Sequence, residues 1–370
     1  PAVALKRKLL LSEIARSIHE RCDPVHAGRA HFRDRKAAWD ILNKWVFRCI
    51  ALSSEANPLP RNEPVIPRRT DAQMVQWLAS QLTTMYGMEA NLPCAFSLCS
   101  ELLLEAEAAC TTLEQHKSAA NGQWRMRLEA GKAICDESLG LTWREHTTQN
   151  GAEVVILWRS SDGNDQSYEY SITLWRHHYT RLANTYLANG HDAKLLHCRL
   201  FSMVCRYDAL SEDKSAFQAA LPPRMLEILH KQFDVEHECY ASPLNRLLDS
   251  FGSAFLDSDH WFGSLGPFHH FRPMQGSFEA NPPFDHASVA ACFRHCGSLL
   301  KESDAPLSFV VVIVQMDFSH SLQQAFNRCA PFLSRPVVRA EASKHAYLMG
   351  LQHRCTGGGK RFWVPEKGSQ

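Results

Sequence analysis

The sequence lacks the patterns that mark several large classes of protein. Its 370 residues contain no Cys-x-x-Cys pair, and the closest cysteines, Cys94 with Cys99 and Cys292 with Cys296, do not match the spacing of a zinc site. No apolar run approaches membrane-spanning length, and the apolar stretch near the amino terminus is too short for a signal peptide. We therefore expect a soluble intracellular protein whose 13 cysteines are reduced thiols.

An excess of charge of one sign is also missing. The chain has 40 basic and 39 acidic residues, so any surface for nucleic acid must be local. There is no GxGxxG after a strand, no GxxxxGK[ST] loop, no GxSxG and no HExxH, so dinucleotide, nucleoside-triphosphate, serine-hydrolase and metalloprotease functions have no sequence support. The glycine-rich stretch "TGGGKRFW" has no strand–helix context and is interpreted as a flexible tail. The chain begins with Pro1 and not with methionine, which indicates a fragment.

Hydrophobic periodicity divides the chain into a helical part and an α/β part. Predicted helices cover 9–22, 35–52, 99–119, 177–188 and 222–233, and Thr70-Asp71-Ala72-Gln73 fits a capping box. Predicted strands cover 153–159, 168–175, 236–242, 276–280, 307–315 and 345–352, the first two as a hairpin. Alternating strands and helices, with a nearly continuous apolar run at 307–315, predict a doubly wound parallel sheet. We expect a helical domain at 1–140 and an α/β domain at 145–365.

The stretch "SFEANPPF", Ser277 to Phe284, ends a strand in an unusual way. Pro282 and Pro283 cannot donate to a sheet ladder or continue a helix, so the strand must stop at Asn281. In open α/β sheets, ligands bind outside the carboxyl ends of the strands. We interpret the segment 281–284 as a rigid platform that holds one amide and one aromatic ring over a pocket. Taken alone, it also fits a simple strand-ending turn.

Such a platform suits the exocyclic amine of adenine, which is a poor nucleophile because its lone pair is delocalised into the ring. Two acceptors aimed at its N–H groups favour the pyramidal geometry that exposes the lone pair. The side-chain oxygen of Asn281 and the carbonyl of Pro282 can be these acceptors, and Phe284 can stack on the base. A methyl group held in line would then transfer through positioning and electrostatics, without a strong base.

A second segment, "ECYASPLN" at 238–245, reads as a strand followed by a turn into a helix. Its small residues Ala241 and Ser242 predict close approach of a ligand to the backbone and exposed amides for an anionic group. Downstream, "FLDSDHWFGSLG" offers Asp257 and Asp259 as carboxylates for ribose hydroxyls and Phe262 as an aromatic ring for a purine. The alternative is that both aspartates are solvated turn residues.

Three motifs, "ECYASPLN", "SAFLDSDHWFGSLGP" and "GSFEANPPF", occur in this order at short spacing. Over about 195–285, and more weakly to about 355, the sequence resembles the phosphorylated-CTD-interacting-factor family, the cap-specific adenosine N(6)-methyltransferases of messenger RNA. The resemblance implies a Rossmann-like, S-adenosylmethionine-dependent methyltransferase core preceded by an α-helical domain. It also implies methylation of the 6-amino group of a 2′-O-methylated adenosine beside a 7-methylguanosine cap. We expect a nuclear location for this reaction.

The resemblance also implies roles for individual residues. The catalytic Asn-Pro-Pro-Phe motif of the family corresponds to Asn281, Pro282, Pro283 and Phe284. Its turn near the methyl donor corresponds to Ser242, Pro243, Leu244 and Asn245, and we extend cofactor contact to Ala241, Asp259 and Phe262.

The chain departs from the family in two places. Animal members carry a WW domain that binds the tail of RNA polymerase II. No such module is found here, since Trp124 and Trp143 lack its proline and strand context, so the polymerase tail is not an expected partner. The region after 307–315 is shorter than expected and lacks a basic insert, so contacts with RNA can differ from those of the family.

Capped messenger RNA is the expected partner and needs a basic groove, because phosphate contacts supply much of the affinity. The candidates are Arg272, Arg335, Arg339 and Lys344, each of which is otherwise a solvated surface charge. No histidine has a metal-ligand spacing, so no metal is expected. Two alternative functions remain open: an N(6)-adenine methyltransferase for non-cap RNA or DNA, and a catalytically inactive module that binds a cap or RNA.

Overall fold

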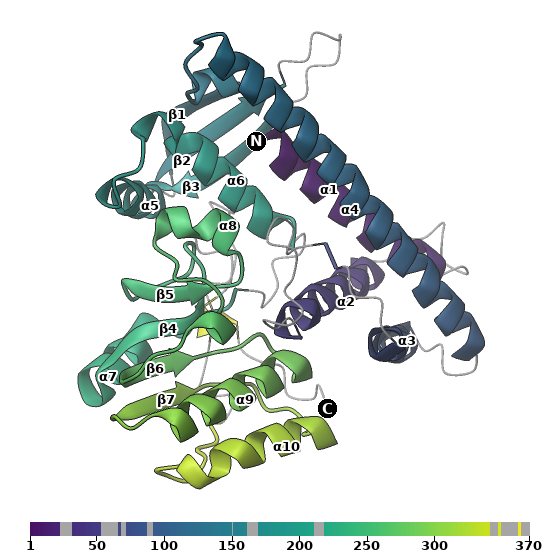
Figure 1. Cartoon of the computed structure of the whole chain (residues 1–370), viewed down its shortest axis with the longest axis vertical. Coiled ribbons are helices and arrows are strands. Elements are labelled where there is room, and N and C mark those ends of the chain that lie inside the picture. Colours follow the sequence, from purple (N-terminus) through teal and green to yellow (C-terminus); the bar gives the residue numbers. More distant parts are fainter. Residues whose placement is uncertain are drawn as a thin grey trace. The chain divides into compact units, whose positions relative to one another are not determined.

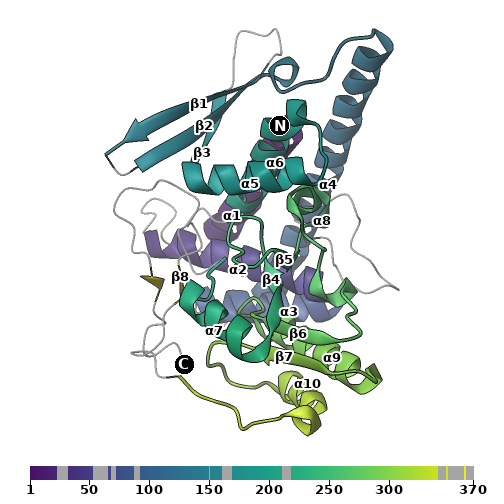
Figure 2. The same ribbon diagram turned by 90° about the vertical axis from the view of Figure 1, so that its left-hand side faces the viewer.

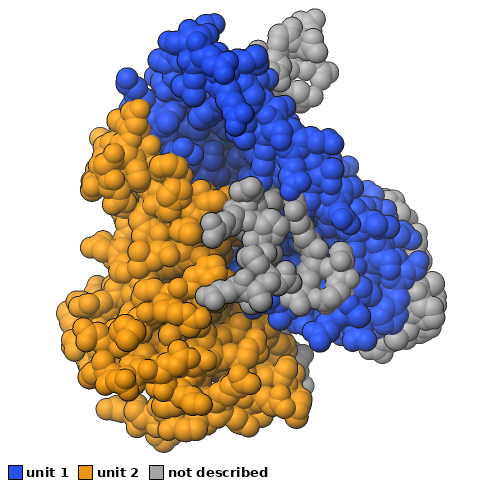
Figure 3. Space-filling model, in the orientation of Figure 1, with its two compact units in different colours: residues 1–143, 156–172, 194–213 blue, residues 144–155, 173–193, 214–370 orange. Residues whose placement is uncertain are grey.

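The computed structural model describes residues 1–22, 32–52, 66–67, 72–86, 92–149, 151–160, 169–210, 218–340, 347–348 and 362–363. The chain forms two compact units that interleave along the sequence (Figure 3). Unit 1 comprises 1–143, 156–172 and 194–213, and unit 2 comprises 144–155, 173–193 and 214–370. The domain boundaries expected from the sequence, 1–140 and 145–365, stay a prediction.

Unit 1 is built mainly from helices that pack through their apolar faces. They are α1 (Ala2–Cys22), α2 (Phe32–Ala51), α3 (Ala72–Tyr86), α4 (Leu92–Glu129) and α6 (Leu196–Asp208). Helix α1 contacts α2, α4 and α6, and it runs beside α4 (Figure 1). Leu11, Ile18 and Trp45 are completely buried. The helices predicted in the first third are thereby confirmed, whereas the capping residues Thr70 and Asp71 lie outside the described residues.

A three-stranded sheet has the order β1-β2-β3, and both units take residues from its strands. The strands are β1 (Leu141–Thr148), β2 (Gly151–Arg159) and β3 (Glu169–Trp175). The strands expected at 153–159 and 168–175 are confirmed, while β1 was not predicted because its residues are mostly polar and exposed. The expectation that Trp143 lacks strand context is therefore wrong. Trp124 lies in α4, so these two tryptophans do not frame one small sheet.

Unit 2 contains a parallel sheet with the order β5-β4-β6-β7. Its strands are β4 (Val235–Ala241), β5 (Ser250–Ser253), β6 (Gly276–Ala280) and β7 (Leu307–Val311). In the register of the sheet, Phe278 of β6 pairs with His237 on one side and with Phe309 on the other. A parallel sheet in this order, accompanied by helices, confirms the α/β class with a Rossmann-like core.

Helices cover both faces of the parallel sheet. Helices α9 (His286–Glu302) and α10 (His320–Cys329) pack residues such as Val289 and Leu322 against Phe278 on one face. Both helices lie beside β6 and β7 in two perpendicular views (Figure 1 and Figure 2). Helix α7 (Pro223–Phe233) packs Leu226 and Leu229 into a second apolar cluster that includes Val310 of β7. Burial on both faces explains why the strands read as apolar runs.

Strand β7 ends at Val311, earlier than the run 307–315 predicted. The amide of Val312 still donates to the carbonyl of Ala280, over 2.9 Å. Beyond this point the neighbouring chain carries Pro282 and Pro283, which offer no amide to a ladder. Because β7 is an edge strand with β6 as its neighbour, its pairing stops where the prolines begin.

The remaining elements are short or lie outside the parallel sheet. They are α5 (Arg176–Ala188), α8 (Leu256–Asp259), β8 (Tyr347–Leu348), β9 (Phe362–Trp363) and 3-10 turns at 137–139, 193–195, 260–262, 268–270 and 330–332. Leu348 pairs with Phe362 in antiparallel fashion, so part of the stretch interpreted as a flexible tail forms a strand. None of the helices in the described ranges is long and apolar enough to cross a membrane.

Candidate active site

Two of the segments expected to be functional lie at the same edge of the parallel sheet. Asn281 directly follows β6, and Ser242 directly follows β4. Since Glu238 pairs with Glu279 in parallel register, the carboxyl ends of the two strands point the same way, and β4 extends about two residues beyond the end of β6. The structure therefore brings together the segments 241–245 and 281–284. This edge is where open α/β sheets bind their ligands.

The side-chain oxygen of Asn281 is a buried acceptor without a donor. Its Oδ1 atom is shielded from solvent and has no hydrogen-bond partner within the part of the chain that the structure describes. Leaving a buried polar atom unsatisfied costs about 1–3 kcal/mol. The neighbouring Pro282 is buried, and the Pro283 carbonyl accepts the amide of Asp285 over 2.8 Å. The platform is thus a turn that holds one buried amide oxygen without a hydrogen-bond donor among the residues described.

Packing fixes the ring of Phe284. The residue is half-buried, and its ring lies 5.3 Å from that of Tyr347, with an angle of 59° between the planes. Phe284 also packs against the apolar cluster that contains Leu226 and Leu229 of α7. Tyr347 is 1% exposed and comes from β8, far along the chain. Sequence analysis did not identify it, because a lone tyrosine in a two-residue strand carries little signal.

A buried carboxyl group lies two residues before the platform. Glu279 is 3% exposed, and its Oε1 atom has no hydrogen-bond partner among the residues described. Alternation along β6 places Glu279 and Asn281 on the same face of the sheet. Burial raises the pKa of Glu279 well above its usual value, and the nearby Glu238 raises it further. Sequence analysis did not single out Glu279, although a glutamate inside the strand "GSFEA", whose other residues are small or apolar, could have indicated a buried carboxyl group.

Glu238 is the parallel partner of Glu279 but has a different environment. Its Oε2 atom accepts the amides of Leu247 at 2.8 Å and Leu248 at 2.7 Å. Burial raises the pKa of Glu238, while these two amide donors oppose the shift. Of the two carboxyl groups, Glu238 is therefore the better placed to carry the charge and Glu279 the better placed to keep its proton.

The turn after β4 is closed by its own side chains. Asn245 Oδ1 accepts the Ser242 amide at 2.7 Å and the Ser242 hydroxyl at 2.9 Å. In return, Ser242 Oγ accepts the amides of Leu244 and Asn245, both at 3.2 Å. Asn245 also donates to the carbonyl of Gln218 over 3.1 Å. The expectation of exposed amides for an anionic group is wrong at Ser242, because its amide donates to Asn245 Oδ1 inside the turn.

The expected helix after this turn is also absent from the structure. The connection 242–249 runs directly from β4 to β5, without a helix between them. Its backbone is held instead by Glu238, which accepts two amides of the connection. Ala241, at the carboxyl end of β4, is half-buried, whereas Ser242, Pro243, Leu244 and Asn245 are buried. A ligand at this edge would thus meet a preformed, small-residue rim.

The other expected cofactor residues lie inside the packing. Asp259 and Phe262 are both 0% exposed. Asp259 Oδ1 accepts the hydroxyl of Ser258 at 2.8 Å, and the ring of Phe262 lies 5.9 Å from that of Tyr186 in α5. Their cofactor roles stay a prediction, because neither side chain reaches the surface in this structure.

The expected RNA-binding residues lie at exposed positions. Arg272, Arg335 and Arg339 are exposed, and Lys344 lies outside the described residues. Their roles also stay a prediction. Among the residues that the structure describes, no group of three or more histidine, cysteine, aspartate or glutamate side chains is arranged to hold a metal ion.

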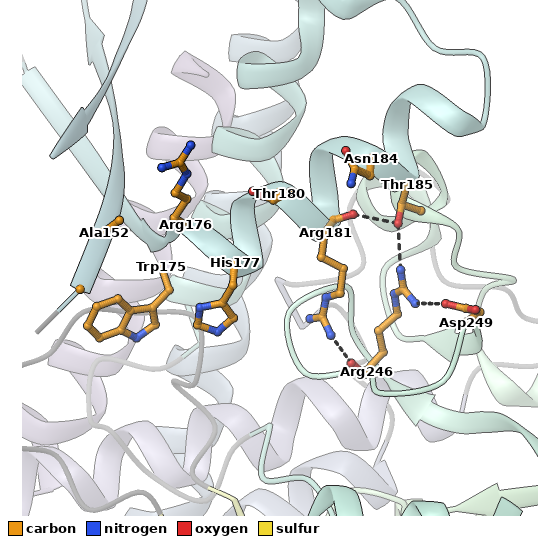
Figure 4. A pocket seen from close by; sticks show the side chains of 11 residues that line it. Ala152, Trp175, Arg176, His177, Thr180, Arg181, Asn184, Thr185, Arg246 and Asp249 are labelled. Carbon is orange, nitrogen blue, oxygen red and sulfur yellow. Dashed lines mark hydrogen bonds and ion pairs between the residues drawn. The ribbon is translucent and has the colours of Figure 1, made fainter. Parts of the chain in front are cut away.

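A separate pocket of about 980 Å3 lies beside the connection 242–249 (Figure 4). Its lining comes from β2, from α5 with the residue before it, and from the connection, all within unit 2. The lining residues are Gly151, Ala152, Trp175, Arg176, His177, Thr180, Arg181, Asn184, Thr185, Arg246 and Asp249. The platform 281–284 does not line it. Sequence analysis missed this pocket, whose clearest local signal is the run Trp175-Arg176-His177.

Comparison with known proteins agrees with the motifs. A family model described as "Phosphorylated CTD interacting factor 1 WW domain" matches residues 175–350. The resemblance predicted from the three motifs is therefore confirmed. The matched segment 175–350 contains the whole parallel sheet, the platform and most of the residues that line the pocket.

Curated proteins that are similar to part of this chain carry an enzyme name. A protein of Homo sapiens named mRNA (2'-O-methyladenosine-N(6)-)-methyltransferase is 40% identical over 142 residues. A protein of Mus musculus with the same name is 40% identical over 141 residues. Each match covers 38% of this chain and 20% of the relative, so the chain matches about a fifth of the length of these relatives.

Proposed function

We propose that this chain transfers a methyl group from S-adenosylmethionine to the 6-amino group of adenosine in RNA. The proposed target is the 2′-O-methylated adenosine next to a 7-methylguanosine cap. The names of the similar human and mouse proteins contain 2'-O-methyladenosine of mRNA as the target. The observation that carries the proposal is the buried, unpartnered Asn281 Oδ1 at the carboxyl end of β6. The proposed partner is capped messenger RNA, and the proposed location is the nucleus.

In this proposal, the platform prepares the amine and positions the base. Asn281 Oδ1 and the Pro282 carbonyl each accept one N–H of the adenine amine, which exposes its lone pair. Pro282 and Pro283 fix the second acceptor, because their rings restrict the backbone. Phe284 contacts the face of the base, while Tyr347 holds the ring from behind. Fixed acceptors of this kind act through preorganisation and need no movement during the reaction.

The rim formed by β4 and its turn fits a methyl donor. Ala241 presents a small, half-buried side chain at the strand end, and the Ser242–Asn245 turn is rigid without any ligand. Such an edge allows close approach to the backbone, which larger side chains would block. Bound S-adenosylmethionine would supply an activated methyl group on a sulfonium. Ala241 and the turn 242–245 would hold it, and buried apolar walls would exclude water.

The first test is labelled-methyl transfer to two short RNAs that begin with 2′-O-methyladenosine. One RNA carries the 7-methylguanosine cap and the other a plain triphosphate. Transfer to the capped RNA alone supports the proposal. Equal transfer to both would support the alternative of a general adenine methyltransferase. Binding of the donor without transfer to either RNA would indicate the inactive-module alternative.

The second test is the variant Asn281→Ala. We expect a 100- to 1,000-fold loss of turnover, because removing one preorganised acceptor typically costs about this much. The fold should remain, since Asn281 Oδ1 has no partner to lose in the residues described. Asn327→Ala is the matched control, because Asn327 is an exposed asparagine of α10 in the same unit. Retention of more than about a tenth of the activity by Asn281→Ala would contradict the assigned role.

A further inference from the structure

The pocket beside the connection 242–249 has two different walls (Figure 4). Figure 4 shows the rings of Trp175 and His177 next to each other, and the guanidinium groups of Arg181 and Arg246 next to each other. Trp175 directly precedes α5, His177 and Arg181 belong to α5, and Arg246 comes from the connection. One wall is thus aromatic and the other cationic.

Two carboxyl groups offset the charge of the cationic wall: Glu238, which is buried and does not line the pocket, and Asp249, which does. Arg246 is 4% exposed, and the Nε atoms of Arg181 and Arg246 have no hydrogen-bond partner in the described part of the chain. Arg246 donates to Asp249 over 3.4 Å, but the Asp249 side chain is fully exposed, so solvent screens its charge. Burial and the charge of Arg246 lower the pKa of Arg181 to about 10. Three arginines but one aspartate line the pocket, and this excess of positive charge favours an anionic ligand.

The beginning of α5 also favours an anion. Its first turn contains Arg176 and His177 and no acidic residue, and the residue before it, Trp175, makes no capping hydrogen bond with its side chain. The first amides of a helix have no intrahelical partner, and the helix dipole makes this end positive. Basic residues at this end are unfavourable, and Arg176 is balanced in part by an exposed ion pair with Glu145 over 3.4 Å. A phosphate group near the first turn would satisfy both the amides and the basic side chains.

The aromatic wall provides a surface for a base. The indole of Trp175 is half-buried, and its ring packs so close to Gly151 that a Cβ there would lie 3.1 Å from the indole atom Cζ3. This packing fixes the ring without covering it. Proteins that bind single-stranded nucleic acid combine aromatic faces with nearby cations in the same way. A base and its phosphate therefore match the two walls together.

We propose that this pocket binds one base and a neighbouring phosphate of the RNA strand that carries the target adenosine. The inference rests on the proposed function for its choice of RNA. The pocket shares the connection 242–249 with the predicted donor turn, since Arg181 donates to the carbonyls of Pro243 and Leu244, both at 3.3 Å. RNA held here lies on the same unit as the platform and adds affinity without touching the reacting amine.

The test measures binding of a fluorescein-labelled, uncapped, single-stranded RNA of about ten nucleotides, without any methyl donor, at several salt concentrations. We expect Trp175→Ala to weaken binding about fivefold or more, whereas Trp175→Phe, which keeps a ring, binds nearly as well as the parent chain. Arg176→Ala should lower the salt slope by about 0.7 for each phosphate contact that is lost. Adenosine monophosphate, as a competitor, should bind far more weakly than the RNA.

Arg224→Ala is the matched control, because Arg224 is an exposed arginine in the first turn of α7 and does not line the pocket. Equal effects of Arg176→Ala and Arg224→Ala would overturn the proposal, because general surface charge would then explain binding. Unchanged binding by Trp175→Ala would overturn it as well. If adenosine monophosphate competed as strongly as unlabelled RNA, the ligand of the pocket would be a free nucleotide and the proposal of an RNA strand would be overturned.

A photocrosslink keeps the proposal testable if a variant does not fold. RNA containing 4-thiouridine is irradiated with the parent chain, and the crosslinked peptide is identified by mass spectrometry. We expect crosslinks on the peptide that contains Trp175 and His177. Crosslinks confined to other peptides would overturn the proposal. Because neither measurement needs turnover, absence of methyl transfer would refute the proposed function and leave this inference standing.

Discussion

Replacing Glu279 by glutamine should change how stability depends on pH. Burial raises the pKa of Glu279 well above its usual value, so the folded chain keeps a proton that the unfolded chain releases. Above the usual glutamate pKa of about 4.3, the unfolded state is therefore favoured more with each increment of pH. The free energy of unfolding should fall as pH rises through this window, up to the pKa of the folded state.

The size of the effect follows from the linkage between proton binding and folding. One proton held only by the folded state changes the free energy of unfolding by about 1.4 kcal/mol per pH unit. Glu279 therefore lowers the free energy of unfolding with at most this slope between pH 5 and the pKa of the folded state. Glu279→Gln has nearly the same shape and carries no charge, so it should remove this contribution and be the more stable chain at pH 7.

Urea unfolding at pH 5, 6 and 7, followed by tryptophan fluorescence, measures the difference. Glu227→Gln is the matched control, because Glu227 is an exposed glutamate of α7 in the same unit. The control should follow the parent chain at every pH. If Glu279→Gln also showed the same pH dependence as the parent, the assignment of a proton to the buried carboxyl group would be refuted.

Two other variants test two further buried ionisable groups, His237 and Asp136. Burial lowers the pKa of His237 to about 4, so between pH 6.5 and pH 4 the unfolded chain binds a proton that the folded chain lacks. The free energy of unfolding should therefore fall by about 1.4 kcal/mol for each unit by which the pH decreases in this window. His237→Phe should flatten this dependence when unfolding is followed in urea. Asp136 accepts the amides of His197 and Cys198 at the start of α6, at 2.9 and 2.7 Å. Asp136→Ala should cost about 2 kcal/mol in chemical unfolding, and an unchanged midpoint would contradict this capping role.

The platform was predictable because its signal is local. Two consecutive prolines end a strand whatever surrounds them, so Asn281 could be placed at a strand end from sequence alone. Strand β5, in contrast, was missed because "SFGS" is short and carries one large apolar side chain. It forms because β4 already presents a ladder beside it, with Glu238 opposite Phe251. Pairing of that kind depends on the partner strand.

The predicted helix after "ECYASPLN" failed for a non-local reason. Leu247 and Leu248 are good helix formers, but their amides donate to Glu238, nine and ten residues earlier. The pocket was missed for a similar reason, since it combines β2, α5 and the connection 242–249. Residues such as Arg181 and Arg246 reveal no shared site until the fold brings them together.

The connection 242–249 therefore links the two proposed sites without making one depend on the other. On one side, Ser242 and Asn245 close the predicted donor turn through their own hydrogen bonds. On the other side, Arg181 holds the carbonyls of Pro243 and Leu244 beside the pocket. Coupling between two ligands requires an element with two alternative arrangements, and this connection is fixed from both sides. RNA in the pocket should then contribute to affinity, while the rate of transfer depends on Asn281 and the rest of the platform.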